Sequence, residues 1–279
     1  GDQRPEPSDG NTAAPVLEKL IRYEAVHEID GWDDLRGRLA ADRRCFGFFH
    51  PAMPDEPLIF VEVALVGGIA EAVAPLIAKD RPIGDPQAAD TAIFYSISNC
   101  QDGLRGISFG NFLIKQVVSE LQAELPNIKT FATLSPVPGM RRALQDREAF
   151  TPARLEALLG DEAWRLLRHN GFVDPVAGLD ALLSDQTELP PAVNKALQRL
   201  TLAYLTQCRR GAGVSDPVGH FHLSNGARLE RINVGADLSA KGLQQSFGVM
   251  VNYLYEPRSL EENHERYVDT GEVVLPRRL

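Results

Sequence analysis

One stretch, residues 91–135, constrains the fold of this 279-residue chain more than any other. It opens with TAIFYSISN, a run of β-branched and aromatic residues that predicts a strand. A glycine-rich segment, QDGLRGISFGN, comes next, and NFLIKQVVSELQAEL then carries apolar residues with a helical period. KTFATLS predicts a second strand, and two strands joined through a helix pair in parallel. The chain therefore contains a strand–loop–helix–strand unit and is expected to have an α/β fold.

The elements on either side of this unit predict a central mixed sheet flanked by helices. RCFGFFH and PLIFVEVALV predict two strands, and the short PAMPDE between them indicates an antiparallel hairpin. Residues 140–210 predict helices almost throughout, which indicates an inserted helical block. After it, DPVGHFHLSNGA predicts a helix that ends at Asn225-Gly226, because glycine adopts the left-handed cap easily. Strands are expected again in ARLERINV and VMVNYLYE.

Charge and composition exclude several classes of partner. Twenty-nine basic and 38 acidic side chains give a net charge of −9, which argues against nucleic acid or an anionic membrane as the main partner. No apolar run approaches the ~20 residues of a membrane span. The three cysteines show neither disulfide nor metal-site spacing, so we expect a reducing compartment. The ending PRRL is not a convincing peroxisomal signal, and we predict a cytoplasmic location. Residues 1–14 are polar and rich in proline and glycine, which predicts a flexible linker before one domain over 15–279.

The stretch FATLSPVPGM places a hydroxyl directly before a stiff turn. Ser135 ends the predicted strand, and Pro136, Pro138 and Gly139 prevent the strand from continuing. One interpretation is that Ser135 caps a helix beginning near Gly139. The other is that the turn holds its hydroxyl toward a reacting molecule. A serine hydrolase is a weaker alternative, because the G-x-S-x-G elbow of many such enzymes is absent.

The glycine loop between strand and helix suits a phosphate or pyrophosphate, because a helix N-terminus offers free N–H groups and a positive dipole end. The dinucleotide and P-loop patterns are absent. The loop resembles the R/Q-x-x-G-x-G/A loop with which acyltransferases of the GNAT superfamily hold the pyrophosphate of coenzyme A, with a serine at the first glycine position. Its residues are Arg105, Gly106, Ile107, Ser108, Phe109, Gly110 and Asn111.

The helix downstream resembles a second pattern of the same superfamily, A-x-x-F-Y-x-x-x-G-F, whose tyrosine faces the thioester sulfur and acts as an acid. Here the segment from Val218 to Ala227 matches it, and His222 stands in the place of the tyrosine. An imidazole with a pKa of ~6.5 exchanges protons near neutrality. His220 lies two residues away and points in a different direction, so at most one of the two faces the site. His220 and His222 have no third ligand nearby at a spacing that suits a metal site.

Five segments together resemble the catalytic domain of the malonyl-CoA decarboxylases: LIRYEAVH, AIFYSIS with its loop, LSPVPG, FHLSNGARLERINVGADLSAKG and GVMVNYLY. The resemblance runs from about Leu17 to Tyr255 in the same order, helical block included. It implies a GNAT-like fold, a carboxy-lyase that converts malonyl-CoA to acetyl-CoA and CO2, and a catalytic pair formed by Ser135 and His222. It also implies that the glycine loop, residues 105–111, binds malonyl-CoA.

The chemistry of decarboxylation bears on the need for a cofactor and on the roles of Ser135 and the tyrosines. The thioester is itself the electron sink, so no cofactor or metal is expected. A hydroxyl is a poor base without activation, so we expect Ser135 to orient groups rather than act as base. Tyr253 and Tyr255 share one face of a strand; we expect Tyr255 to bind substrate, a core position being the alternative.

The rival functions are an N-acyltransferase that uses an acyl-CoA donor and a non-catalytic regulator that binds acyl-CoA. Both would keep the glycine loop, and they differ from a decarboxylase in what happens to malonyl-CoA alone. The resemblance also implies an N-terminal all-helical domain that is not found in these residues. The resemblance implies a homo-oligomer formed partly through that domain, so the assembly state of this chain stays open.

Overall fold

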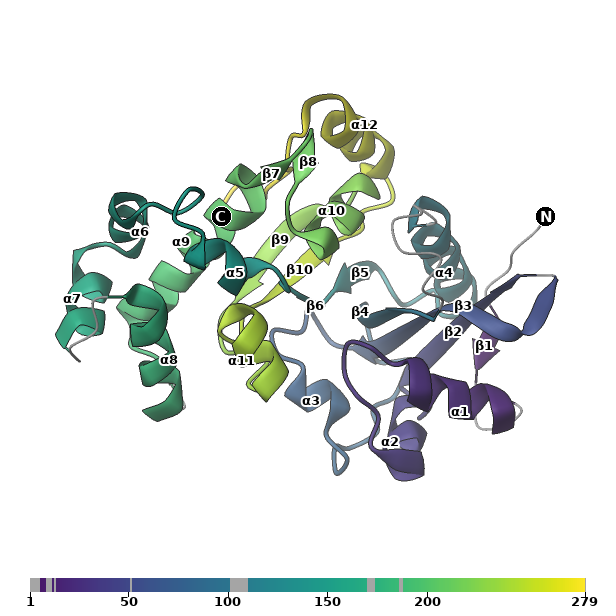
Figure 1. Ribbon diagram of the computed structural model, residues 1–279. Coiled ribbons are helices and arrows are strands. Elements are labelled where there is room, and N and C mark those ends of the chain that lie inside the picture. The colour runs from purple at the N-terminus through teal and green to yellow at the C-terminus, as the bar shows by residue number, and fades with distance from the viewer. Residues whose placement is uncertain are drawn as a thin grey trace. The chain divides into compact units, whose positions relative to one another are not determined.

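The structure, a computed structural model, divides into two compact units. The first holds Gly1–Ser135 and Tyr253–Leu260, and the second holds Pro136–Asn252 and Glu261–Leu279. Figure 1 follows the chain through both by colour and element label. Each unit buries its own set of large apolar side chains and so has its own core. The residues that the structure describes are 6–8, 12, 14–50, 52–100, 110–169, 174–185 and 188–278.

Antiparallel strands form one part of the sheet in the first unit. β2 (Arg43–His50) pairs with β3 (Met53–Val66), which confirms the predicted hairpin, and β3 pairs with β4 (Thr91–Asn99). Within the stretch predicted to be a linker, β1 (Glu6–Ser8) pairs with β2. Nearly all residues of β4 are buried, which is typical of a strand covered on both faces.

A parallel pair completes the predicted strand–loop–helix–strand unit. β5 (Thr130–Thr133) lies parallel to β4, and α4 (Gly110–Glu124) connects the two strands. The parallel register ends where Phe94 lies opposite Thr133. β4 continues beyond that point, still paired with β3. The residues that follow β5, beginning with Leu134 and Ser135, therefore leave the strand where its ladder with β4 stops.

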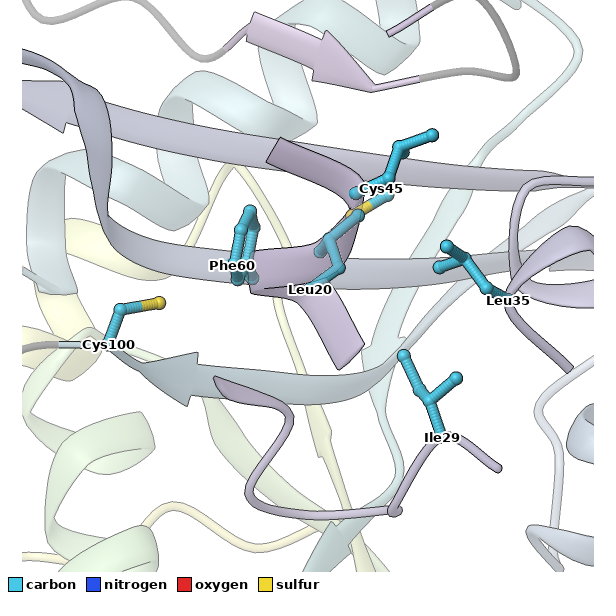
Figure 2. Close-up of a cluster of buried hydrophobic side chains, with 7 residues drawn as sticks. Leu20, Ile29, Leu35, Cys45, Phe60 and Cys100 are labelled. Atoms are coloured by element: carbon cyan, nitrogen blue, oxygen red, sulfur yellow. The ribbon is translucent and has the colours of Figure 1, made fainter. Parts of the chain in front are cut away.

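The core of the first unit holds two helices against the sheet. These are α1 (Ala14–Tyr23) and α2 (Gly31–Arg38). Figure 2 shows the cluster, in which Leu20 and Leu35 from the helices are buried together with Phe60 of β3. The helical spacing of apolar residues in α1 produces this buried face. Burial of apolar area is the main stabilising contribution here.

Two of the three cysteines belong to this core. Cys45 and Cys100 are buried free thiols (Figure 2). Burial raises the pKa of both thiols, that of Cys100 to about 12. A reactive cysteine needs a lowered pKa and access to solvent, so both are packing residues.

Helices make up the first part of the second unit, as predicted for residues 140–210. They are α5 (Met140–Gln145), α6 (Pro152–Leu159), α7 (Asp161–His169), α8 (Pro175–Asp185) and α9 (Pro191–Gln207). α6 contacts both α7 and α9, and α7 contacts α8. Figure 1 shows α6 to α9 as a group within this unit. The inserted block is thus a small helical assembly, and α9 is a helix through which it contacts the rest of this unit.

The elements not yet named are short strands and helices, and the first of them belongs to the first unit. They are α3 (Ala74–Ile77), β6 (Ser135–Pro136), β7 (Arg209–Arg210), β8 (Gly213–Val214), α10 (Pro217–Ser224), β9 (Arg228–Asn233), α11 (Ala240–Ser246), β10 (Met250–Leu254) and α12 (Leu260–Thr270). β9 pairs with β10. α10 ends as predicted, because Gly226 has a φ of 84° in the left-handed region. Within the described ranges, no helix combines the length and hydropathy that a bilayer crossing requires.

Candidate active site

Ser135 lies just beyond β5 with a defined hydroxyl direction. Its Oγ donates a hydrogen bond to Oγ1 of Thr133 at 2.8 Å, and the same Oγ1 accepts the backbone N–H of Tyr253 at 3.1 Å. Residues two apart in extended chain share a face, which brings the two hydroxyls together. Ser135 is 5% exposed and Thr133 is fully buried. Side-chain and backbone contacts thus orient the Ser135 hydroxyl within the first unit.

The capping interpretation of Ser135 is wrong. α5 begins at Met140, and its N-cap residue is Gly139, four positions after the serine. A glycine is required there, because a Cβ at this position would overlap Oη of Tyr204. The turn therefore ends with a close approach to α9 rather than with a cap made by the serine.

Asp216 joins three elements of the second unit. Its Oδ1 accepts the N–H of Gly219 at 2.8 Å and caps α10, while its Oδ2 accepts Oη–H of Tyr204 at 3.2 Å and the N–H of Gly139 at 3.4 Å. Asp216 is fully buried, and this burial raises the pKa of its carboxyl to about 6 against the opposing effect of these donors and of the N–H of Val218. Burial also raises the pKa of Tyr204, so its hydroxyl stays protonated. One carboxylate thus fixes α9, the turn before α5, and the start of α10.

His222 lies on α10, six residues after Asp216. Its side chain is 2% exposed, and burial lowers the pKa of the imidazole to about 3. The sequence led us to expect titration near neutrality; the structure differs, because desolvation disfavours the imidazolium. At pH 7 the buried imidazole is therefore neutral.

The two histidines of α10 point in different directions, as predicted. His220 is exposed, and its Nδ1 lies 2.8 Å from Oη of Tyr267 on α12, whereas His222 is buried. His220 thus has a structural partner at the surface. In the part of the chain that the structure describes, no three His, Cys, Asp or Glu side chains group as a metal site.

The remaining predicted residues are those expected to bind substrate: Tyr255 and the residues of the glycine loop. Tyr255 is buried, donates its N–H to the carbonyl of Phe131 at 2.8 Å, and lies with its ring 6.4 Å from that of Phe94. α4 begins at Gly110, as the loop–helix boundary predicts, and Asn111 is its second residue. Five loop residues lie outside the described part of the chain: Arg105, Gly106, Ile107, Ser108 and Phe109.

Sequence reasoning missed three residues that contact Ser135 in the first unit or hold the helix of His222 in the second. Asp216 directly precedes Pro217 at a helix start, a common N-cap and N1 pair that could have been recognised. Thr133 lies two residues before Ser135 in a predicted strand, so it shares the same face. Tyr204 comes from the inserted block and carries no sequence signal for its contact with Asp216.

Comparison with a solved domain identifies the fold. The loading GNATL domain of CurA from Lyngbya majuscula superposes with a TM-score of 0.50 at 11% identity, covering 90% of this chain and 97% of that chain. At this identity the likeness shows the fold alone. It confirms the predicted GNAT-like fold with a central mixed sheet and flanking helices.

Closer relatives share one family. A family model described as malonyl-CoA decarboxylase C-terminal domain matches residues 6–279. Malonyl-CoA decarboxylase from Rhodopseudomonas palustris is 46% identical with a TM-score of 0.85, over 98% of this chain and 64% of that one. The mitochondrial malonyl-CoA decarboxylase of Anser anser anser is 36% identical over 92% of this chain and 53% of its own length. The chain thus spans between half and two thirds of these relatives, and it belongs to the malonyl-CoA decarboxylase C-terminal domain family.

Proposed function

We propose that this chain catalyses the decarboxylation of malonyl-CoA to acetyl-CoA and CO2. The observation that carries the proposal is the family match over residues 6–279. The two residues implied as the catalytic pair are both buried and held by neighbouring groups, as a reacting site requires: Ser135 by Thr133, and the helix of His222 by Asp216. The glycine loop, residues 105–111, and Tyr255 are proposed to bind the acyl-CoA.

The chemistry assigns separate tasks to these groups. The bond between C2 and the carboxylate breaks, CO2 leaves, and the electron pair enters the thioester carbonyl to form an enolate. A proton then adds to C2, so each turnover consumes one proton. Hydrogen-bond donors that face the developing oxyanion lower the barrier most. We assign proton delivery to His222 and orientation of the substrate carboxylate to Ser135, whose hydroxyl would turn from Thr133 to donate to that carboxylate when the substrate binds.

The neutral imidazole of His222 must gain a proton before it can donate one. An opposite charge nearby raises the pKa of an imidazole, and the malonyl carboxylate supplies that charge. We therefore infer that binding of the substrate carboxylate causes His222 to take up one proton from solvent. Transfer of that proton to C2 leaves the imidazole neutral, and it stays neutral because acetyl-CoA carries no carboxylate on its acyl group.

Proton uptake on binding tests this step. A thioether analogue of malonyl-CoA keeps the carboxylate but lacks the carbonyl that accepts electrons. Its binding at pH 7.5 is expected to take up close to one proton, measured by titration calorimetry in buffers of different ionisation enthalpy. Acetyl-CoA is expected to take up none. Equal uptake for both ligands, or uptake that persists in His222→Asn, would show that another group receives the proton.

The role of Ser135 is tested by paired variants. Ser135→Ala is expected to lower kcat by about 10- to 100-fold, the effect of one lost hydrogen bond to a charged group. Thr133→Val removes the acceptor that orients the serine and should give a smaller loss, while Thr133→Ser should retain activity. Unchanged turnover in Ser135→Ala would remove the residue from the mechanism.

Incubation with malonyl-CoA alone tests the proposed reaction. Formation of acetyl-CoA and CO2 without an acceptor is expected. Binding without turnover would indicate an acyl-CoA-binding regulator, and turnover only with an added amine would indicate an N-acyltransferase. Release of free coenzyme A would indicate hydrolysis. The homo-oligomer and the cytoplasmic location inferred from the sequence stay predictions.

A further inference from the structure

The side chain of Asn225 at the end of α10 is buried without a partner. It is 3% exposed, and neither its Oδ1 nor its Nδ2 makes a hydrogen bond to any described residue. Its backbone N–H is engaged by the carbonyls of Phe221 and His222. A buried amide that loses water and gains no partner destabilises the fold. Such a group calls for an explanation, and a bound ligand is one.

Other buried amides of the second unit behave differently. Asn263 donates from Nδ2 to the carbonyl of Gly226 at 3.0 Å, and Asn233 donates from Nδ2 to Oδ1 of Asn252 at 2.8 Å. These amides connect structural elements. The end of α10 does not require the amide of Asn225, because the left-handed Gly226 terminates the helix through the backbone.

The position of Asn225 relates it to the proposed proton donor. It follows His222 by three residues, and side chains at this spacing lie on one face of a helix, about 5–6 Å apart at Cβ. Both side chains are almost fully buried. A ligand that reaches His222 from this face therefore passes close to the amide of Asn225.

The amide also restricts the chemistry of that ligand. It has a donor and an acceptor to satisfy, so the partner must offer an acceptor and a donor. The malonyl carboxylate and the enolate offer acceptors only. A secondary amide offers both, and two methylene groups separate the thioester sulfur of coenzyme A from the first amide of its pantetheine arm.

We propose that Asn225 binds the pantetheine amide nearest the thioester sulfur, and so sets the position of the thioester along α10. This inference rests on the proposed function, since it takes an acyl-CoA as the ligand. Asn225 donates from Nδ2 to the pantetheine carbonyl and accepts the pantetheine N–H at Oδ1. The residue thereby selects for thioesters of pantetheine over simpler thioesters.

Truncated substrates isolate this contact. The malonyl thioester of N-acetylcysteamine carries the amide, and the malonyl thioester of pentanethiol has the same chain length without it. The protein is expected to prefer the first by about tenfold in kcat/KM, which corresponds to about 1.4 kcal/mol. Asn225→Leu is expected to lose that preference. An equal loss with both thioesters would place Asn225 at the acyl group and overturn the proposal.

Measurements of unfolding and of coenzyme A binding distinguish a binding role of Asn225 from a structural role. Asn225→Leu removes unpaired polar atoms, so its midpoint of urea unfolding is expected to stay unchanged or rise, while its dissociation constant for coenzyme A, by calorimetry, rises about tenfold. Asn263→Leu is the matched control; it loses a structural hydrogen bond, so its unfolding midpoint falls and its substrate preference stays. Unchanged affinity for coenzyme A in Asn225→Leu contradicts the inference even if the protein decarboxylates nothing.

Discussion

Replacing His222 by asparagine is expected to lower kcat for malonyl-CoA by about 10²–10⁴-fold, the usual contribution of a positioned acid. The substitution removes the only group in our scheme that delivers a proton to C2. Asparagine approximates the size of the imidazole and donates a hydrogen bond, so the affinity for acetyl-CoA should change little. The loss should therefore appear in kcat rather than in binding.

The measurement is steady-state release of CO2, with acetyl-CoA affinity from calorimetry. His220→Asn is the matched control, because His220 lies on the same helix, is exposed, and hydrogen-bonds to Tyr267. Near-normal turnover in the control is expected. Equal losses in both variants would mean that the substitutions disturb α10 itself, and near-normal turnover in His222→Asn would exclude it as the proton donor.

The parts of the fold that could be predicted are those fixed by local pattern. The parallel pairing of β4 and β5 follows from a strand, a helix and a strand in sequence, and the end of α10 follows from Asn225-Gly226. The direction of His222 relative to His220 follows from helical geometry. Each of these depends on residues close together in the chain.

Contacts between distant residues could not be predicted in the same way. The hydroxyl of Tyr204 reaches Asp216 across twelve residues, and the carboxylate also takes the N–H of Gly139 from 77 residues away. The pKa of His222 depends on complete burial, a property of the packed unit rather than of the FHL motif. The motif identified the imidazole, but its protonation state required the surrounding structure.

The buried carboxylate and the buried imidazole have opposite effects on how stability depends on pH. The pKa of Asp216 is raised to about 6 in the folded state, so between its ordinary value of 3.8 and 6 the folded state holds a proton that the unfolded state has released. Stability from this group therefore falls as pH rises. The pKa of His222 is lowered to about 3, so between 3 and its ordinary value of 6.5 the unfolded state holds the extra proton. Stability from this group rises with pH.

Between pH 4 and 6 the two slopes, each about 1.4 kcal/mol per pH unit, offset one another in the unmodified protein. Asp216→Asn is expected to leave the His222 slope uncompensated, so that its free energy of unfolding, relative to the unmodified protein, rises by about 2 kcal/mol from pH 4 to 6. His222→Asn should fall by a similar amount over the same interval. The double variant should follow the unmodified protein, apart from a constant offset for the lost hydrogen bonds.

Urea unfolding at half-unit intervals of pH measures these differences, because groups that titrate alike in all four proteins cancel. The sign of the change in unfolding free energy with pH, relative to the unmodified protein, distinguishes the possibilities. If Asp216→Asn loses stability relative to the unmodified protein as pH rises, the carboxyl of Asp216 in the unmodified protein is ionised throughout this range. The hydrogen bonds from Gly139, Gly219 and Tyr204 then outweigh the effect of burial on its pKa. If His222→Asn shows no slope, the imidazole is protonated in the folded protein throughout this range, and burial does not lower its pKa. The pH dependence of folding thus tests the protonation state on which the proposed catalytic step depends.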